Sequence, residues 1–192
     1  MARIVPSLST RSAVYSPEIT QSCRNRSYSD IYQNMYERQR LETFLSQEIQ
    51  SHNTHARQQG HQDDAVKAVW QAIVWTCALD EFCAKTTTFG SSAYRRFRSS
   101  DACGQYVQGV RYAHNRAAHQ ATEVIRVVNL PTFPVLSPIP FFEITWRLIT
   151  AFPPPEADRP DPRGEEAYAW LLQDQPVRFT FHALASFFKR SS

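Results

Sequence analysis

Residues 63–85, "DDAVKAVWQAIVWTCALDEFCAK", form the most hydrophobic long segment of the chain. The two leading aspartates suit the start of a helix, because negative charge is stabilised near a helix N-terminus. Apolar residues cover more than one face of that helix, which is typical of a helix surrounded by others. The segment therefore predicts a central core helix in which Trp70, Ile73 and Val74 are buried.

Two further long helices are predicted on either side of this segment. Residues 29–50 carry apolar side chains near helical spacing, and Ser29 is a candidate cap. Residues 86–100, "TTTFGSSAYRRFRSS", break the pattern and indicate a connection. A third helix is expected over 101–128, with Val110, Val124 and Ile125 on its buried stripe. Three such helices predict an antiparallel bundle.

The composition changes after residue 128. Residues 129–140 and 152–164 are rich in proline, which excludes continuous helix, whereas "FFEITWRLI" at 141–149 favours a short strand. Two short helices are expected at 164–174 and 179–189. The predicted fold is mainly α: an antiparallel helical bundle with a proline-rich, partly extended C-terminal region and two short terminal helices. We expect a disordered leader over 1–26, the bundle over 27–128, and residues 129–192 docked on it.

Composition restricts the classes of function. The chain has 21 basic and 18 acidic residues and a formal net charge of +3, so any nucleic-acid site must be local. No segment approaches the run of about 18 apolar residues that a membrane span requires. The four cysteines lack C-x-x-C spacing, which favours a reduced, cytoplasmic protein. The five glycines are too dispersed for a glycine-rich phosphate loop.

The polar segment between the first two helices contains residue types that bind metals, namely His52, His55, His61, Asp63 and Asp64. The spacing matches no defined metal motif. We interpret the segment as a polar interhelical connection, and the sequence predicts neither a metal nor another cofactor.

The stretch 111–120, "RYAHNRAAHQ", concentrates polar chemistry on the third helix. Arg111, Asn115 and His119 are spaced i, i+4 and i+8, so they follow one line that drifts about 40° per step beside the apolar stripe. His114 is nearer the stripe and fits either a hydrogen-bonded core histidine or a chemical role. Arg116 is expected to point away into solvent.

The run "HNRAAH" at 114–119 resembles the motif of the HEPN superfamily, R-N-x-x-x-H, with His114 in place of the arginine. The resemblance implies a small helical bundle and metal-independent RNA cleavage at a site shared across a homodimer. In a toxin or defence ribonuclease of this kind, His119 would be the acid or base, Arg111 the phosphate clamp and Asn115 the orienting residue. A toxin of this class would pair with an antitoxin protein.

A basic stretch precedes the third helix, because no acidic residue occurs between Phe82 and Ser100. Arginine next to aromatic rings suits single-stranded RNA, with guanidinium groups on phosphates and rings on bases. The alternative is a solvated loop that its aromatic residues anchor to the bundle. The candidate RNA-binding residues are Tyr94, Arg95, Arg96 and Arg98. The whole chain then fits either an RNA-acting protein, an endoribonuclease included, or a non-catalytic helical interaction module.

Overall fold

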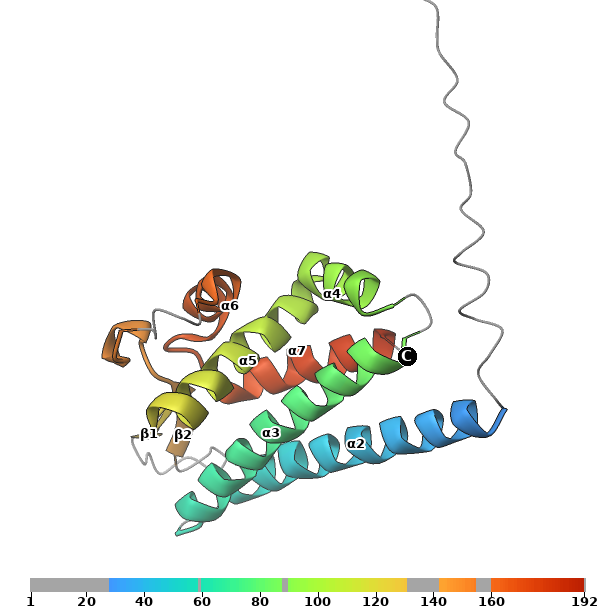
Figure 1. Ribbon diagram of the computed structural model, residues 1–192. Helices are drawn as coiled ribbons and strands as arrows, with labels where there is room; N and C mark the ends of the chain where they lie inside the picture. Colours follow the sequence, from blue (N-terminus) through green and yellow to red (C-terminus); the bar gives the residue numbers. More distant parts are fainter. Residues whose placement is uncertain (1–27, 59, 88–89, 131–141, 155–159, 192) are drawn as a thin grey trace, which may run out of the picture.

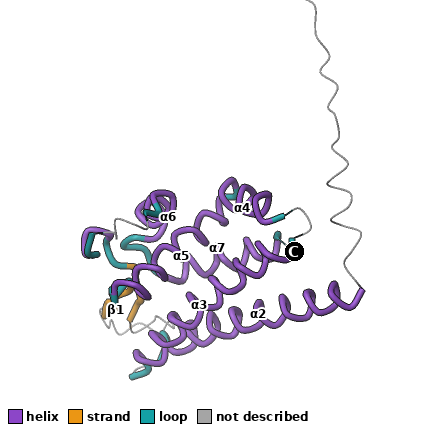
Figure 2. Tube along the Cα trace, in the orientation of Figure 1, coloured by secondary structure: helices purple, strands orange, loops and turns teal. Residues whose placement is uncertain are grey.

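The computed structural model describes residues 28–58, 60–87, 90–130, 142–154 and 160–191. Helices dominate this part of the chain (Figures 1 and 2), as predicted. The predicted leader at 1–26 lies outside the described residues, as do residues 131–140 and 155–159 of the two proline-rich segments. The helices are α2 (Tyr28–His55), α3 (Gln62–Thr86), α4 (Ser91–Ser100), α5 (Ala102–Gln120), α6 (Pro162–Ala167) and α7 (Val177–Arg190).

Helix α5 lies at the centre of the helix packing. It contacts α3, α4, α6 and α7, while α2 and α3 form a helical hairpin along one side (Figure 1). Asp101 caps α5, since its side chain accepts hydrogen bonds from the backbone N–H groups of Cys103 and Gly104 at 2.8 Å.

No described helix is long and apolar enough to cross a membrane.

The prediction of one helix over 101–128 is wrong after residue 120. Helix α5 ends at Gln120, and Ala121 adopts a left-handed backbone conformation with φ of 47°. Residues Ile125–Asn129 then form strand β1, which pairs antiparallel with β2 (Phe142–Trp146). Val124, Ile125 and Val128 continue the helical spacing of the apolar stripe, but β-branched side chains also favour strands, and the partner strand decides between the two. The strand predicted within 141–149 is confirmed.

The connection predicted over 86–100 contains helix α4. Its serines and arginines suggested a loop, but Tyr94, Phe97 and Arg98 share one face at helical spacing. Phe97 stacks on Phe187 of α7 with ring centroids 5.6 Å apart, and Tyr94 is buried. These tertiary contacts stabilise a short helix that has little apolar surface of its own.

The C-terminal segment packs on the bundle through buried aromatic residues. The Trp146 indole donates a hydrogen bond to Thr180 Oγ1 at 2.8 Å, and the Tyr168 hydroxyl donates one to the Arg147 carbonyl at 2.7 Å. A π-helical turn, η2 (Tyr168–Leu172), follows α6 directly. Helix α7 contacts α5 and α2 and buries a row of large side chains, namely Phe181, Leu184, Phe187 and Phe188.

The predicted core residues are mostly buried. Ile73, Val110, Val124 and Ile125 are buried, but Trp70 is only partly buried and Val74 is 47% exposed. The buried side of α3 runs through Ala65, Val69, Ala72, Ile73, Thr76, Asp80 and Cys83. Helix α3 is apolar on several faces, so its own periodicity could not show that Val74 is exposed.

Candidate functional site

A buried carboxylate, Asp80 on α3, ties α3 to α4 and α5. The Tyr94 hydroxyl donates a hydrogen bond to Asp80 Oδ1 at 3.0 Å, and Arg111 Nη1 lies 3.0 Å from Oδ2. Arg98 also pairs with Oδ2. Burial, together with the Asp80 charge, raises the pKa of Tyr94, so its hydroxyl stays protonated and remains a donor. One carboxylate therefore holds two arginines that are themselves only partly buried.

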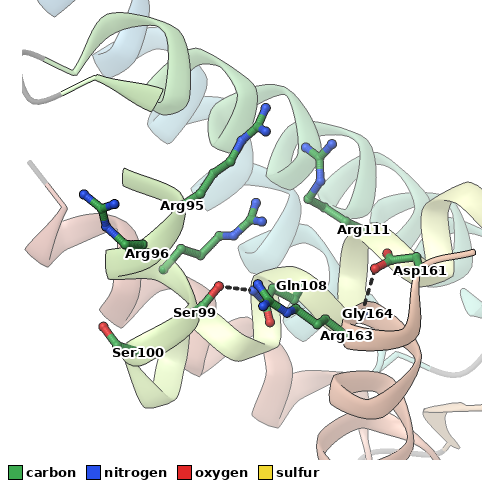
Figure 3. A pocket seen from close by; sticks show the side chains of 10 residues that line it. Arg95, Arg96, Ser99, Ser100, Gln108, Arg111, Asp161, Arg163 and Gly164 are labelled. Carbon is green, nitrogen blue, oxygen red and sulfur yellow. Dashed lines mark hydrogen bonds between the residues drawn. The ribbon is translucent and has the colours of Figure 1, made fainter. Parts of the chain in front are cut away.

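Next to this cluster lies an open pocket of about 470 Å³ between α4, α5 and the start of α6 (Figure 3). We call it the arginine pocket. Its lining residues are Arg95, Arg96, Arg98, Ser99, Ser100, Gln108, Arg111, Asp161, Arg163 and Gly164. Five arginines thus face a single carboxylate, Asp161, which already caps α6 by accepting from the Gly164 N–H at 3.0 Å. Asp80 offsets part of the charge of Arg98 and Arg111, and Arg95, Arg96 and Arg163 leave the lining with an excess of positive charge.

The five arginines differ in their partners and exposure. Arg98 and Arg111 are oriented by Asp80, whereas Arg95, Arg96 and Arg163 are exposed and pair with no acidic group among the described residues. In Figure 3 the guanidinium groups of Arg95 and Arg111 extend to the same side, while Arg96 extends outward from α4. Unpaired arginines beside oriented ones suit an anionic ligand, because guanidinium binds phosphate oxygens in a bidentate geometry.

Of the three residues predicted to lie along one line of α5, only Arg111 lines this pocket. Asn115 and His119 do not line it, and both are exposed farther along the helix. Eight residues of helix separate Arg111 from His119, about 12 Å along the axis. His114 is half-buried and makes no side-chain hydrogen bond to another described residue. Within one chain, the arginine and the imidazole therefore do not converge on a common point.

Tyr94 has a structural role in place of the predicted contact with a base. It is buried and donates its hydroxyl to Asp80, so its ring cannot stack on RNA. The exposed aromatic residue of α4 is Phe97, 40% exposed beside Arg96 and Arg98.

Arg116, predicted to be solvated, is buried. Its guanidinium donates a hydrogen bond to the Pro153 carbonyl and lies 5.7 Å from the ring centroids of both Tyr112 and Phe152. The helical face opposite the apolar stripe of α5 is covered by the segment after β2, which the spacing within α5 could not reveal.

Two parts of the site were not predicted. Arg163 reaches the pocket because α6 packs against α5, a contact between residues far apart in the sequence. Asp80 was not predicted either, although an acidic residue inside the most hydrophobic helix indicates a buried partner, since an unpaired charge is costly to bury.

Comparison with protein-family models, curated protein sequences and solved structures finds no match for this chain. The HEPN-like resemblance accordingly rests on residues 114–119 alone.

Proposed function

We propose that the protein binds RNA through the arginine pocket. The observation that carries the proposal is the grouping of five arginines from α4, α5 and α6 around an open pocket with one carboxylate. Because α4 and α6 are far apart in the sequence, this charge is a property of the folded chain. Affinity for a nucleic-acid backbone depends mainly on such phosphate contacts.

A polynucleotide suits the pocket better than a single phosphate. The arginines project from three helices and in more than one direction, so they can contact successive phosphates along a strand (Figure 3). Arg98 and Arg111 are held by Asp80, which lowers the entropy lost when they bind a ligand. Phe97 stacks on Phe187, and the 40% of its surface that stays exposed beside Arg96 and Arg98 can contact a base. The choice of RNA over DNA comes from the HEPN-like motif.

The catalytic part of the proposal rests on that motif. If the bound RNA is cleaved, His119 is the acid or base, Asn115 orients it, and Arg111 contributes charge at the pocket. Since Arg111 and His119 do not converge within one chain, cleavage requires a second copy or a strand that bridges both positions. His114 takes part only if it replaces the arginine of the family motif.

Self-association belongs to the same proposal. The exposed apolar side chains Tyr32, Met35 and Tyr36 lie on one side of α2, and Trp170 is 81% exposed on η2. We expect a homodimer in sedimentation equilibrium at micromolar concentration, and an antitoxin protein is the further partner that the resemblance implies. A strictly monomeric chain would remove the shared-site mechanism while leaving RNA binding intact.

Fluorescence anisotropy with a labelled single-stranded RNA tests the binding proposal. The double variant Arg95→Ala/Arg163→Ala removes two exposed, unpaired arginines of the pocket. The matched control is Arg40→Ala/Arg57→Ala, which removes the same charge from two exposed positions, one on α2 and one in the connection between α2 and α3. Charge-assisted hydrogen bonds contribute about 1.5–3 kcal/mol each, so the pocket variant should bind at least about tenfold more weakly than the control.

Equal affinity of the two double variants would contradict the proposal. If the wild-type chain binds neither the RNA nor DNA of the same sequence, the non-catalytic interaction module becomes the better account. Equal binding of RNA and DNA would indicate recognition of phosphates alone.

A further inference from the structure

A second cluster of polar side chains lies where α2 meets α3, at the opposite end of α3 from α4 (Figure 1). His55, the last residue of α2, and His61 and Asp64, at the start of α3, place one potential ligand atom each within 4.8 Å of one another. His61 Nδ1 lies 3.1 Å from Asp64 Oδ2, and the two imidazole rings stack with centroids 5.3 Å apart. The turn brings together three ligand-type groups from two helices.

The backbone of this turn fixes the two histidines. Gln58 N–H donates to the His55 carbonyl at 3.0 Å, and Ala65 N–H donates to the His61 carbonyl at 3.1 Å. Gly60 has φ of +85°, a left-handed conformation that glycine adopts without strain. Buried Ala56 and Ala65 anchor the turn on both sides. The site is therefore held by local hydrogen bonds and packing.

One polar atom in the cluster lacks a partner. His55 Nδ1 is buried and forms no hydrogen bond with a described residue. A buried nitrogen without a partner costs free energy, and a bound cation is one way to satisfy it. Two imidazoles and one carboxylate form a donor set that suits Zn²⁺, and tetrahedral zinc ligands lie about 3.4 Å apart at bond lengths of about 2.0–2.2 Å. The His61–Asp64 separation of 3.1 Å is close to that spacing, and the stacked imidazoles of His55 and His61 would have to rotate so that a ring nitrogen of each points at the ion.

We propose that His55, His61 and Asp64 bind a divalent transition-metal ion, Zn²⁺ in particular, which fastens the α2–α3 hairpin. The ion would link the end of one helix to the start of the next, and a water molecule would complete a tetrahedral site. The three ligands lie far from the arginine pocket, so the ion acts on the stability of the hairpin and is independent of RNA binding. This proposal does not rest on the proposed function.

Zinc titration of the full-length, metal-free chain tests the site. We expect one Zn²⁺ ion per chain by isothermal titration calorimetry, and a rise of about 5–10 °C in Tm at a free Zn²⁺ concentration near 100 times Kd. His61→Ala should weaken binding at least about tenfold. His61 is exposed, so the variant should fold, which circular dichroism checks. His182→Ala, at an exposed histidine of α7, is the matched control and should bind as the wild type does.

Co²⁺ substitution identifies the ligands. Binding through His55, His61 and Asp64 gives a d–d spectrum without thiolate charge-transfer absorption, and Asp64→Asn should alter that spectrum. A thiolate band would assign the metal to the cysteines and overturn the proposal. Equal Zn²⁺ affinity of wild type and His61→Ala would overturn it as well, as would a wild-type chain whose Tm does not respond to Zn²⁺.

Discussion

Replacing Asp80 with asparagine is the most informative perturbation of the fold around the pocket. The substitution keeps the size of the side chain and removes the charge that pairs with Arg98 and Arg111. The Asp80 side chain is 2% exposed, whereas those of Arg98 and Arg111 are 15% and 29% exposed. The carboxylate is thus the fully desolvated partner, and both arginines keep some contact with water.

The magnitude follows from these exposures. Removing one partner of a buried ion pair costs about 3–5 kcal/mol, because the remaining charge stays buried without compensation. Partial hydration of both arginines places Asp80→Asn at the lower end, about 3 kcal/mol. For a chain of this size, that loss lowers Tm by about 6–12 °C.

Urea unfolding, monitored by circular dichroism, measures this loss of unfolding free energy, with Glu81→Gln as the control. Glu81 is 56% exposed and lies 3.6 Å from Arg111 Nη2, so neutralising it should cost less than about 1 kcal/mol. If the unfolding free energy of Asp80→Asn lies within about 1 kcal/mol of the wild-type value, the carboxylate does not organise the pocket. The argument from oriented arginines then fails.

Three other substitutions test separate parts of the structure. Burial lowers the pKa of His52, so the unfolded chain takes up its proton first and the fold loses stability as pH falls below about 6.5. His52→Gln should reduce that loss between pH 7 and 5, whereas an unchanged pH profile would show that His52 is protonated freely. Gly104→Ala should cost about 1–2 kcal/mol in urea unfolding, because its Cβ would meet the Arg98 carbonyl and Phe187; wild-type stability would contradict this packing. If the chain cleaves RNA, His119→Ala should slow cleavage about 10²–10⁴-fold at unchanged stability, and an undiminished rate would exclude His119 as acid or base.

The long helices were predictable because their apolar spacing is maintained over many turns. Residues 63–85 show this clearly, since the predicted helix and α3 differ by one residue at each end. Helix α4 and strand β1 were mispredicted for one physical reason. Each depends on a partner distant in sequence, Phe187 for α4 and β2 for β1, and local propensity contains no information about that partner.

The candidate site was predictable only in part for a similar reason. Arg95, Arg96 and Arg98 were identified from their local charge, whereas Arg163 joins them only through the packing of α6 on α5. The segment after β2 likewise reverses the expectation for Arg116, because Phe152 and the Pro153 carbonyl cover it. Spacing on one helix placed Arg111 and His119 on one line, but it could not show that Asp80 holds the Arg111 guanidinium.

The salt dependence of RNA binding tests the central claim most directly. For single strands, each phosphate neutralised by the protein contributes about 0.7 to the slope of log Kobs against log salt concentration. If Arg95, Arg96 and Arg163 each contact a phosphate, the triple alanine variant should show a slope shallower by about 2 than the wild type. A triple variant that binds more weakly or equally, but with the wild-type slope, would show that these arginines contact no phosphate and would contradict the account.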